Sequence, residues 1–137
     1  MRLALSLVFA CLASAAYPLT TKLYPELALR GGEATPVPDT GITLLLTDIT
    51  DGRCPPEADC TWEGMIRAEI TVTTPDTPPQ TIILCNLCED GTSIVTAAGQ
   101  TLALIGLTPS TEELARLGRA PRLTDYTLTV SYAPAGP

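Results

Sequence analysis

The chain has 137 residues, 45% of them hydrophobic, which suits one domain with a single hydrophobic core. Its formal net charge of −7 argues against binding to nucleic acid or anionic lipid, because such binding depends on Lys and Arg side chains. The sequence contains no histidine, which excludes His-dependent hydrolases and the usual histidine-ligated metal enzymes.

Residues 1–16 have the features of an export signal. Arg2 gives a positive start, the apolar run LALSLVFACL follows, and ASAA offers small residues for cleavage before Tyr17. The apolar run is shorter than the roughly 20 residues of a transmembrane helix. Lipidation of Cys11 is an alternative, but the preceding VFA is a poor lipobox, so cleavage near Ala16 is favoured. We expect residues 17–137 to be one exported domain without a transmembrane segment, in the periplasm, cell envelope or on the cell surface.

Alternating apolar and polar residues predict that this domain consists of β-strands. From Ile66 to Val72, every second residue is apolar and those between are polar, as in a strand with one buried face. The predicted strands are ELALR (26–30), ITLLLTDIT (42–50), MIRAEITVT (65–73), TIILC (81–85), TSIVTA (92–97), QTLALIGL (100–107) and YTLTVSY (126–132). The loop TPDTPP (74–79) predicts a hairpin, and Asp90-Gly91 predicts a tight reversal between TIILC and TSIVTA.

One short helix is predicted near residues 111–117. Ser110 can cap its start, Glu113 completes a capping box, and Gly118 and Pro121 mark its end. About seven short strands with turn signals between them favour an all-β fold over alternating β-α units. We therefore expect a single immunoglobulin-like antiparallel β-sandwich.

The segment DGRCPPEADCTWEG (51–64) is the most distinctive part of the sequence, with two cysteines, two prolines and the only tryptophan. It resembles a family of small exported bacterial proteins and lipoproteins with the signature D-x-R-C-P, a few residues, C, then x-W-x-G. The matching positions are Asp51, Arg53, Cys54, Pro55, Cys60, Trp62 and Gly64. The resemblance implies export and a similar β-fold, and it implies no particular chemistry.

Four cysteines remain after residue 16, and export favours their oxidation. Because the family-like segment is self-contained, the favoured pairing is Cys54 with Cys60 and Cys85 with Cys88. A Cys54–Cys60 bridge would stabilise the fold by roughly 2–2.5 kcal/mol, whereas a bridge between the two cysteine pairs would contribute roughly 3.7 kcal/mol. Four cysteines allow three pairings, and the sequence is compatible with the local pairing and with bridges between the two pairs.

The residues around this loop are also binding candidates. Trp62 is expected to pack on the bridge and cap one end of the sandwich, and Glu63 follows it. Arg53 is placed to pair with Asp48, Asp51 or Glu57.

Three kinds of chemistry are alternatives to a purely structural loop. Cys54, Cys60, Cys85 and Cys88 could ligate zinc or copper, in a metal or redox protein that includes an atypical superoxide-dismutase-like activity. The CNLC motif (85–88) has the C-x-x-C form of thiol–disulfide catalysts, but it lies beside a strand and not at a helix start. A hard cation could bind the carboxylates Asp48, Asp51, Glu57 and Asp59, although their spacing matches no known loop.

The favoured functional interpretation is a binding or structural module without a cofactor. Its partner would be another envelope or surface protein, or a second copy of itself in a homo-oligomer, reached through a strand edge or the loop that carries Trp62. No catalytic residues are recognised. A further idea is that CPPEADC (54–60) is presented to a protease as an inhibitory loop.

Overall fold

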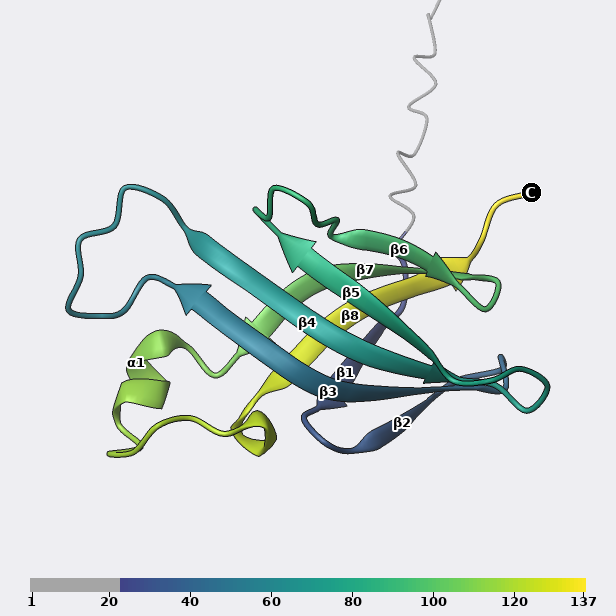
Figure 1. Ribbon diagram of the computed structural model, residues 1–137, viewed down its shortest axis with the longest axis horizontal. Helices are drawn as coiled ribbons and strands as arrows, with labels where there is room; N and C mark the ends of the chain where they lie inside the picture. Colours follow the sequence, from purple (N-terminus) through teal and green to yellow (C-terminus); the bar gives the residue numbers. More distant parts are fainter. Residues whose placement is uncertain (1–22) are drawn as a thin grey trace, which may run out of the picture.

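The computed structural model describes residues 23–137, which form two packed antiparallel β-sheets (Figure 1). The first sheet has the order β2 (Ala34–Val37), β3 (Ile42–Arg53), β4 (Gly64–Thr73) and β5 (Gln80–Asn86). The second has the order β1 (Glu26–Arg30), β8 (Thr127–Pro134), β7 (Gln100–Thr108) and β6 (Ile94–Ala97). The predicted all-β sandwich is confirmed. The predicted export signal and Cys11 lie outside the described residues.

The connections between strands are simple. β2 to β5 follow one another as antiparallel neighbours, as do β6 to β8, and β1 joins the second sheet beside β8. The chain therefore crosses between sheets only after β1 and after β5 within residues 23–137. An immunoglobulin constant domain divides its strands as ABED and CFG. The likeness to that fold lies in the two packed sheets and not in the order of the strands.

All seven predicted strands are present, together with an eighth that the sequence did not indicate. This strand is β2, which spans four residues and contains Pro36. Proline cannot donate to a strand ladder and is tolerated at the edge of a sheet, where β2 lies. Its alternation is too short to stand out, so its existence depends on pairing with β3, with Pro36 opposite Thr43.

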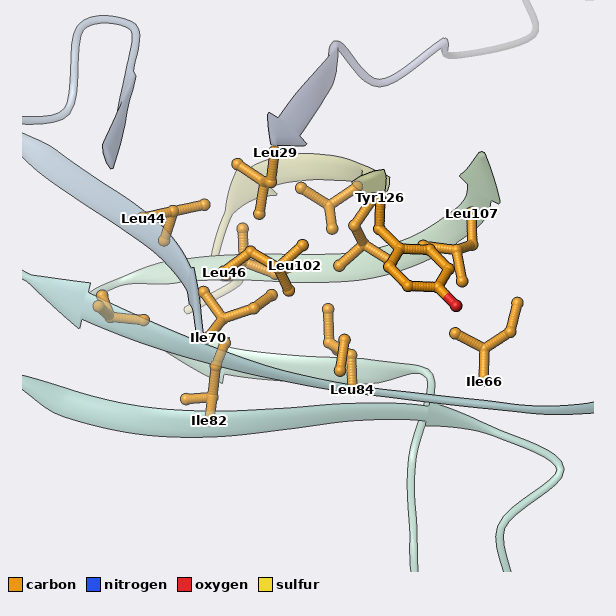
Figure 2. Close-up of a cluster of buried hydrophobic side chains, with 14 of the residues drawn as sticks. Leu29, Leu44, Leu46, Ile66, Ile70, Ile82, Leu84, Leu102, Leu107 and Tyr126 are labelled. Atoms are coloured by element: carbon orange, nitrogen blue, oxygen red, sulfur yellow. The ribbon is translucent and has the colours of Figure 1, made fainter. Parts of the chain in front are cut away.

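The hydrophobic core lies between the two sheets. Figure 2 shows Leu44, Leu46 and Ile70 of the first sheet facing Leu29 and Leu102 of the second. These five side chains are at most 2% exposed, and full burial of such a side chain contributes about 1.5–3 kcal/mol. The predicted inward set of β4 is confirmed, because every second residue from Ile66 to Val72 is buried.

A glycine corner closes the sandwich where the chain passes from β1 to β2. The Gly31 N–H donates to the carbonyl of Tyr126, just before β8, at 3.0 Å, and the Gly32 N–H donates to that of Leu46 in β3, at 2.9 Å. A Cβ atom at Gly31 would overlap the Leu123 carbonyl. Glycine at this position therefore allows the two sheets to be joined closely.

The connection from β7 to β8 contains α1 (Thr111–Ala115) and the 3-10 turn η1 (Leu123–Asp125). The predicted capping box is present: the Glu113 N–H donates to Ser110 Oγ, and the Ser110 N–H donates to Glu113 Oε2. The helix is two residues shorter than expected, because it ends at Ala115. Within residues 23–137 no helix is long and apolar enough to cross a membrane.

Candidate functional site

The loop between β3 and β4 is held by a disulfide and a turn. Cys54 is bonded to Cys60, with 5.9 Å between their Cα atoms, as in the favoured pairing. Inside the ring, the Ala58 N–H donates to the Pro55 carbonyl at 3.1 Å. All residues from Pro55 to Glu63 are exposed. The loop thus projects from one end of the sandwich, near α1 (Figure 1).

Gly64 allows the chain to return from this loop into β4. It has φ +83°, a conformation that side chains other than glycine rarely adopt. A Cβ atom there would also overlap the Gly52 carbonyl and lie 2.6 Å from the Cα atom of Arg53 on the paired strand. Backbone conformation and lack of space therefore both require glycine at position 64, the last position of the D-x-R-C-P…C-x-W-x-G pattern.

Arg53 links the base of the loop to the other sheet. Its Nε and Nη2 donate to the two carboxylate oxygens of Asp51, each at 2.8 Å. Its Nη1 and Nη2 also donate to the carbonyls of Leu107, at 2.9 Å, and Pro109, at 2.8 Å, at the end of β7. Asp51 is thus the partner among the three carboxylates that the sequence offered. The guanidinium of this binding candidate is engaged by hydrogen bonds within the protein, so in this structure Arg53 holds the base of the loop to the second sheet.

The charges in this cluster are mutually stabilised. Burial alone would raise the pKa of Asp51, but hydrogen bonds from the Arg53 side chain and backbone, with the Arg53 charge, hold this pKa below its ordinary 3.8. The hydrogen bond to Asp51 raises the pKa of Arg53. Burial, followed by the negative charge of Asp51, raises the pKa of Tyr126, whose hydroxyl is hydrogen-bonded to that carboxylate. Asp51 is therefore ionised, and Tyr126 neutral, at neutral pH.

The second disulfide lies where the chain leaves the first sheet. Cys85 of β5 is 2% exposed and is bonded to Cys88 in the following loop. The Cys85 N–H donates to the Thr92 carbonyl at 2.8 Å, which ties the far end of this loop back to β5. The predicted tight reversal at Asp90-Gly91 is wrong, because β5 and β6 belong to different sheets and the loop must cross between them. Gly91 fits against the disulfide, since a Cβ atom there would lie 2.7 Å from each cysteine Cβ.

A depression of about 750 Å³ lies between the two disulfide-bonded loops, on the outer face of the first sheet. Its apolar lining comes from Trp62, Met65, Ile83 and Leu87. Trp62 and Leu87 are 62% and 61% exposed, which is unusual for large apolar side chains. The expectation that Trp62 caps the sandwich is therefore wrong: its ring is at the surface and borders this depression.

Charged residues surround the apolar lining. Glu89 and Asp90 border the depression from the β5–β6 loop. Arg67 lines it as well, but its Nη2 donates to Glu69 Oε1 at 3.1 Å. Glu63 is exposed next to Trp62 and is not part of the lining. The depression therefore combines an apolar lining with two carboxylates from the β5–β6 loop.

The lining residues that the sequence did not indicate come from strand pairing. Arg67 lies opposite Cys85 and Glu69 lies opposite Ile83 in the β4–β5 ladder, so these four share the outer face of the sheet. Met65 is two residues before Arg67 and lies on the same face. The alternation of β4 already placed Met65 outward, but only the register shows that Ile83 is close to it.

The candidate metal ligands are not assembled into a site. The four cysteines form two separate disulfides, and the Asp51 carboxylate is bonded to Arg53. Across residues 23–137, no group of three or more Cys, Asp or Glu side chains is placed to hold a metal ion. Neither the cysteine set nor the set Asp48, Asp51, Glu57 and Asp59 has the geometry of a metal centre.

Comparison with known proteins found no matching family model, no matching curated protein and no matching solved structure.

Proposed function

We propose that this chain is an exported bacterial cell-envelope or cell-surface module that serves as a structural, protein-binding accessory domain. We further propose that it binds its partner with the depression around Trp62. The observation that carries this proposal is the exposure of Trp62 in an apolar lining with Met65, Ile83 and Leu87. Exposed aromatic side chains beside a pocket are typical of the residues that dominate protein–protein binding energy.

The surroundings of Trp62 support binding because disulfides constrain the two loops beside it. The Cys54–Cys60 bridge shortens the loop on one side of it, and Gly64 fixes the return into β4 on the other. The Cys85–Cys88 bridge holds Leu87 across the depression. A surface that is already ordered loses less conformational entropy on binding.

Export is supported by two independent features. The pattern of residues 1–16 is typical of an export signal, and two disulfides within residues 23–137 are typical of proteins in oxidising compartments. The resemblance of residues 51–64 to small exported bacterial proteins and lipoproteins, and the immunoglobulin-like sandwich, agree with an envelope or surface location.

The charge of the site indicates the chemistry of the partner. Glu63, Glu89 and Asp90 are exposed near the apolar lining, and the whole chain carries −7. A partner surface with an apolar side chain for the depression and Lys or Arg beside it would be complementary. Binding to such a surface should weaken as the salt concentration rises.

A site-specific photo-crosslinker tests the proposal in the producing cells. Benzoylphenylalanine in place of Trp62 should give one adduct of constant mass, and Leu87→Asp should abolish it. The same crosslinker in place of Thr96, which is exposed on β6 of the other sheet, is the matched control. Equal labelling from positions 62 and 96, or no adduct from position 62, would contradict the proposal. The mass of the chain recovered from envelope and culture fractions tests export and cleavage before Tyr17.

A further inference from the structure

The four edge strands of the sandwich differ in how well they are protected against pairing. β2 and β6 have only four residues each, and β2 contains Pro36; β1 carries Glu26 and Arg30 at its ends. Short length, proline and charge are the usual devices that prevent edge-to-edge association. β5 has seven residues, QTIILCN, with no charge and no proline. It is the least protected edge of the described sandwich.

The free backbone groups of β5 can be assigned from its existing bonds. The Cys85 N–H donates to Thr92 and so points away from β4. In an antiparallel ladder alternate residues direct their backbone groups to the same side. The N–H and C=O groups of Thr81 and Ile83 therefore also point away from β4, and no strand of the described chain lies there.

The free stretch is short and bounded at both ends. Pro79, which has no N–H, precedes β5, and the N–H of Cys85 is already bonded. Thr81 and Ile83, one on each side of Ile82, are therefore the residues of β5 with both an N–H and a C=O group available. A long partner strand would meet the β4–β5 loop (74–79) at one end of β5 and the loop held by the Cys85–Cys88 disulfide at the other. A second β5 strand has the same short, symmetrical set of groups.

We propose that two copies of the chain pair through β5 in a two-fold antiparallel ladder centred on Ile82. Thr81 of each copy then lies opposite Ile83 of the other, and each of these pairs can exchange two N–H···O=C bonds, which uses the outward N–H and C=O groups of both residues. The pairing joins the two β2-β3-β4-β5 sheets into one continuous sheet. The small ladder makes this a reversible, concentration-dependent dimer and not an obligate one.

Charge favours a second copy at this edge. Two acidic chains repel one another, and this repulsion is smallest where the contacting surfaces carry no charge, as along β5. On the outer face, Thr81 has Thr71 of its own β4 on one side and, in the proposed register, Ile83 of the second copy on the other. Glu69 of the second copy follows beyond that Ile83. No carboxylate faces another across this ladder, so the register avoids the like-charge pairs that destabilise sheets.

The pairing also covers apolar surface. Ile83 is 39% exposed on the outer face. In the proposed register the two Ile83 side chains are diagonal neighbours, about 7–8 Å apart between backbones and within reach of one another. Because Ile83 also lines the depression beside Trp62, the two depressions would lie on one continuous face of the joined sheet.

Charge reversal across the ladder tests both the dimer and its register. Sedimentation equilibrium over a concentration series of the mature protein should show a reversible dimer. Thr81→Lys/Ile83→Lys and Thr81→Glu/Ile83→Glu should each be monomeric, because like charges meet at both opposed pairs. An equimolar mixture of the two variants should restore a dimer. The control Ala34→Lys/Thr96→Lys adds the same charge at exposed positions of β2 and β6 and should leave the wild-type dimer unchanged.

Amide hydrogen exchange of the wild-type protein gives a test without mutation. The N–H groups of Thr81 and Ile83 should become protected as concentration rises, while the exchange of other edge residues stays constant. A wild-type protein that is monomeric throughout, or a dimer that survives the double lysine change, overturns the proposal, whatever is crosslinked at position 62. Restoration by the mixed variants supports this register, and failure of the mixture to dimerise refutes it.

Discussion

Replacing Arg53 by methionine should destabilise the fold through groups that Arg53 now satisfies. The Asp51 and Arg53 side chains are only 10% and 17% exposed, so the change leaves a largely buried carboxylate without its cation. The carbonyls of Leu107 and Pro109 also lose a charged donor each. Breaking a fully buried ion pair costs about 3–5 kcal/mol, and an unsatisfied buried polar group about 1–3 kcal/mol. Because this cluster keeps some contact with solvent, we expect a loss of about 2–4 kcal/mol.

Urea unfolding followed by tryptophan fluorescence and circular dichroism measures this loss. The matched control is Arg119→Met, since Arg119 makes the same two-point contact with Asp125, at 2.7 and 2.9 Å, in a more exposed place. Surface pairs of this kind contribute little to stability, so the control should change the unfolding midpoint much less. Equal effects of the two substitutions would show that the links from Arg53 to the second sheet do not stabilise the fold.

Three further predictions concern the same end of the molecule. Asp51→Asn should lower the free energy of unfolding at neutral pH, and the loss should become progressively smaller below about pH 4. The reason is that the pKa of Asp51 is lowered by folding, so its carboxylate stabilises the fold at pH values above the unfolded pKa of 3.8 and loses this effect as the pH falls. Urea titrations at a series of pH values check this. Gly64→Ala should cost more than Gly41→Ala in thermal unfolding, because both glycines have positive φ but only Gly64 has backbone where the new methyl group would lie. Cys54→Ala/Cys60→Ala should lose about 2 kcal/mol and remain folded, as judged by circular dichroism.

The strands and the helix could be predicted from sequence because their signals are local. The alternation of β4 identifies its buried face, and Ser110 with Glu113 identifies the start of α1. β2 could not be found, because four residues with a central proline form a strand only when β3 is beside them. The tight reversal predicted at Asp90-Gly91 is wrong for a related reason: local turn chemistry does not reveal that the next strand belongs to the other sheet.

The candidate site was only partly predictable. The resemblance around Cys54 and Cys60 led to the observed pairing, and nearby carboxylates suggested an ion pair for Arg53. The exposure of Trp62 could not be anticipated, because large aromatic side chains in small domains are usually at least partly covered. Its neighbours come from β4, β5 and the second disulfide loop, and their proximity depends on strand register and on the crossing after β5.

The local pairing of the cysteines itself indicates what the disulfides do. Bridges across three and six positions close very small rings, and each stabilises the fold by only about 2 kcal/mol. Pairing between the two loops would close a longer ring and contribute roughly 3.7 kcal/mol. The core of leucine, isoleucine and valine already holds the sheets together. The two bridges therefore contribute most by ordering the loops that carry Trp62 and Leu87, so reduction should disturb this surface at denaturant concentrations where the sandwich remains folded.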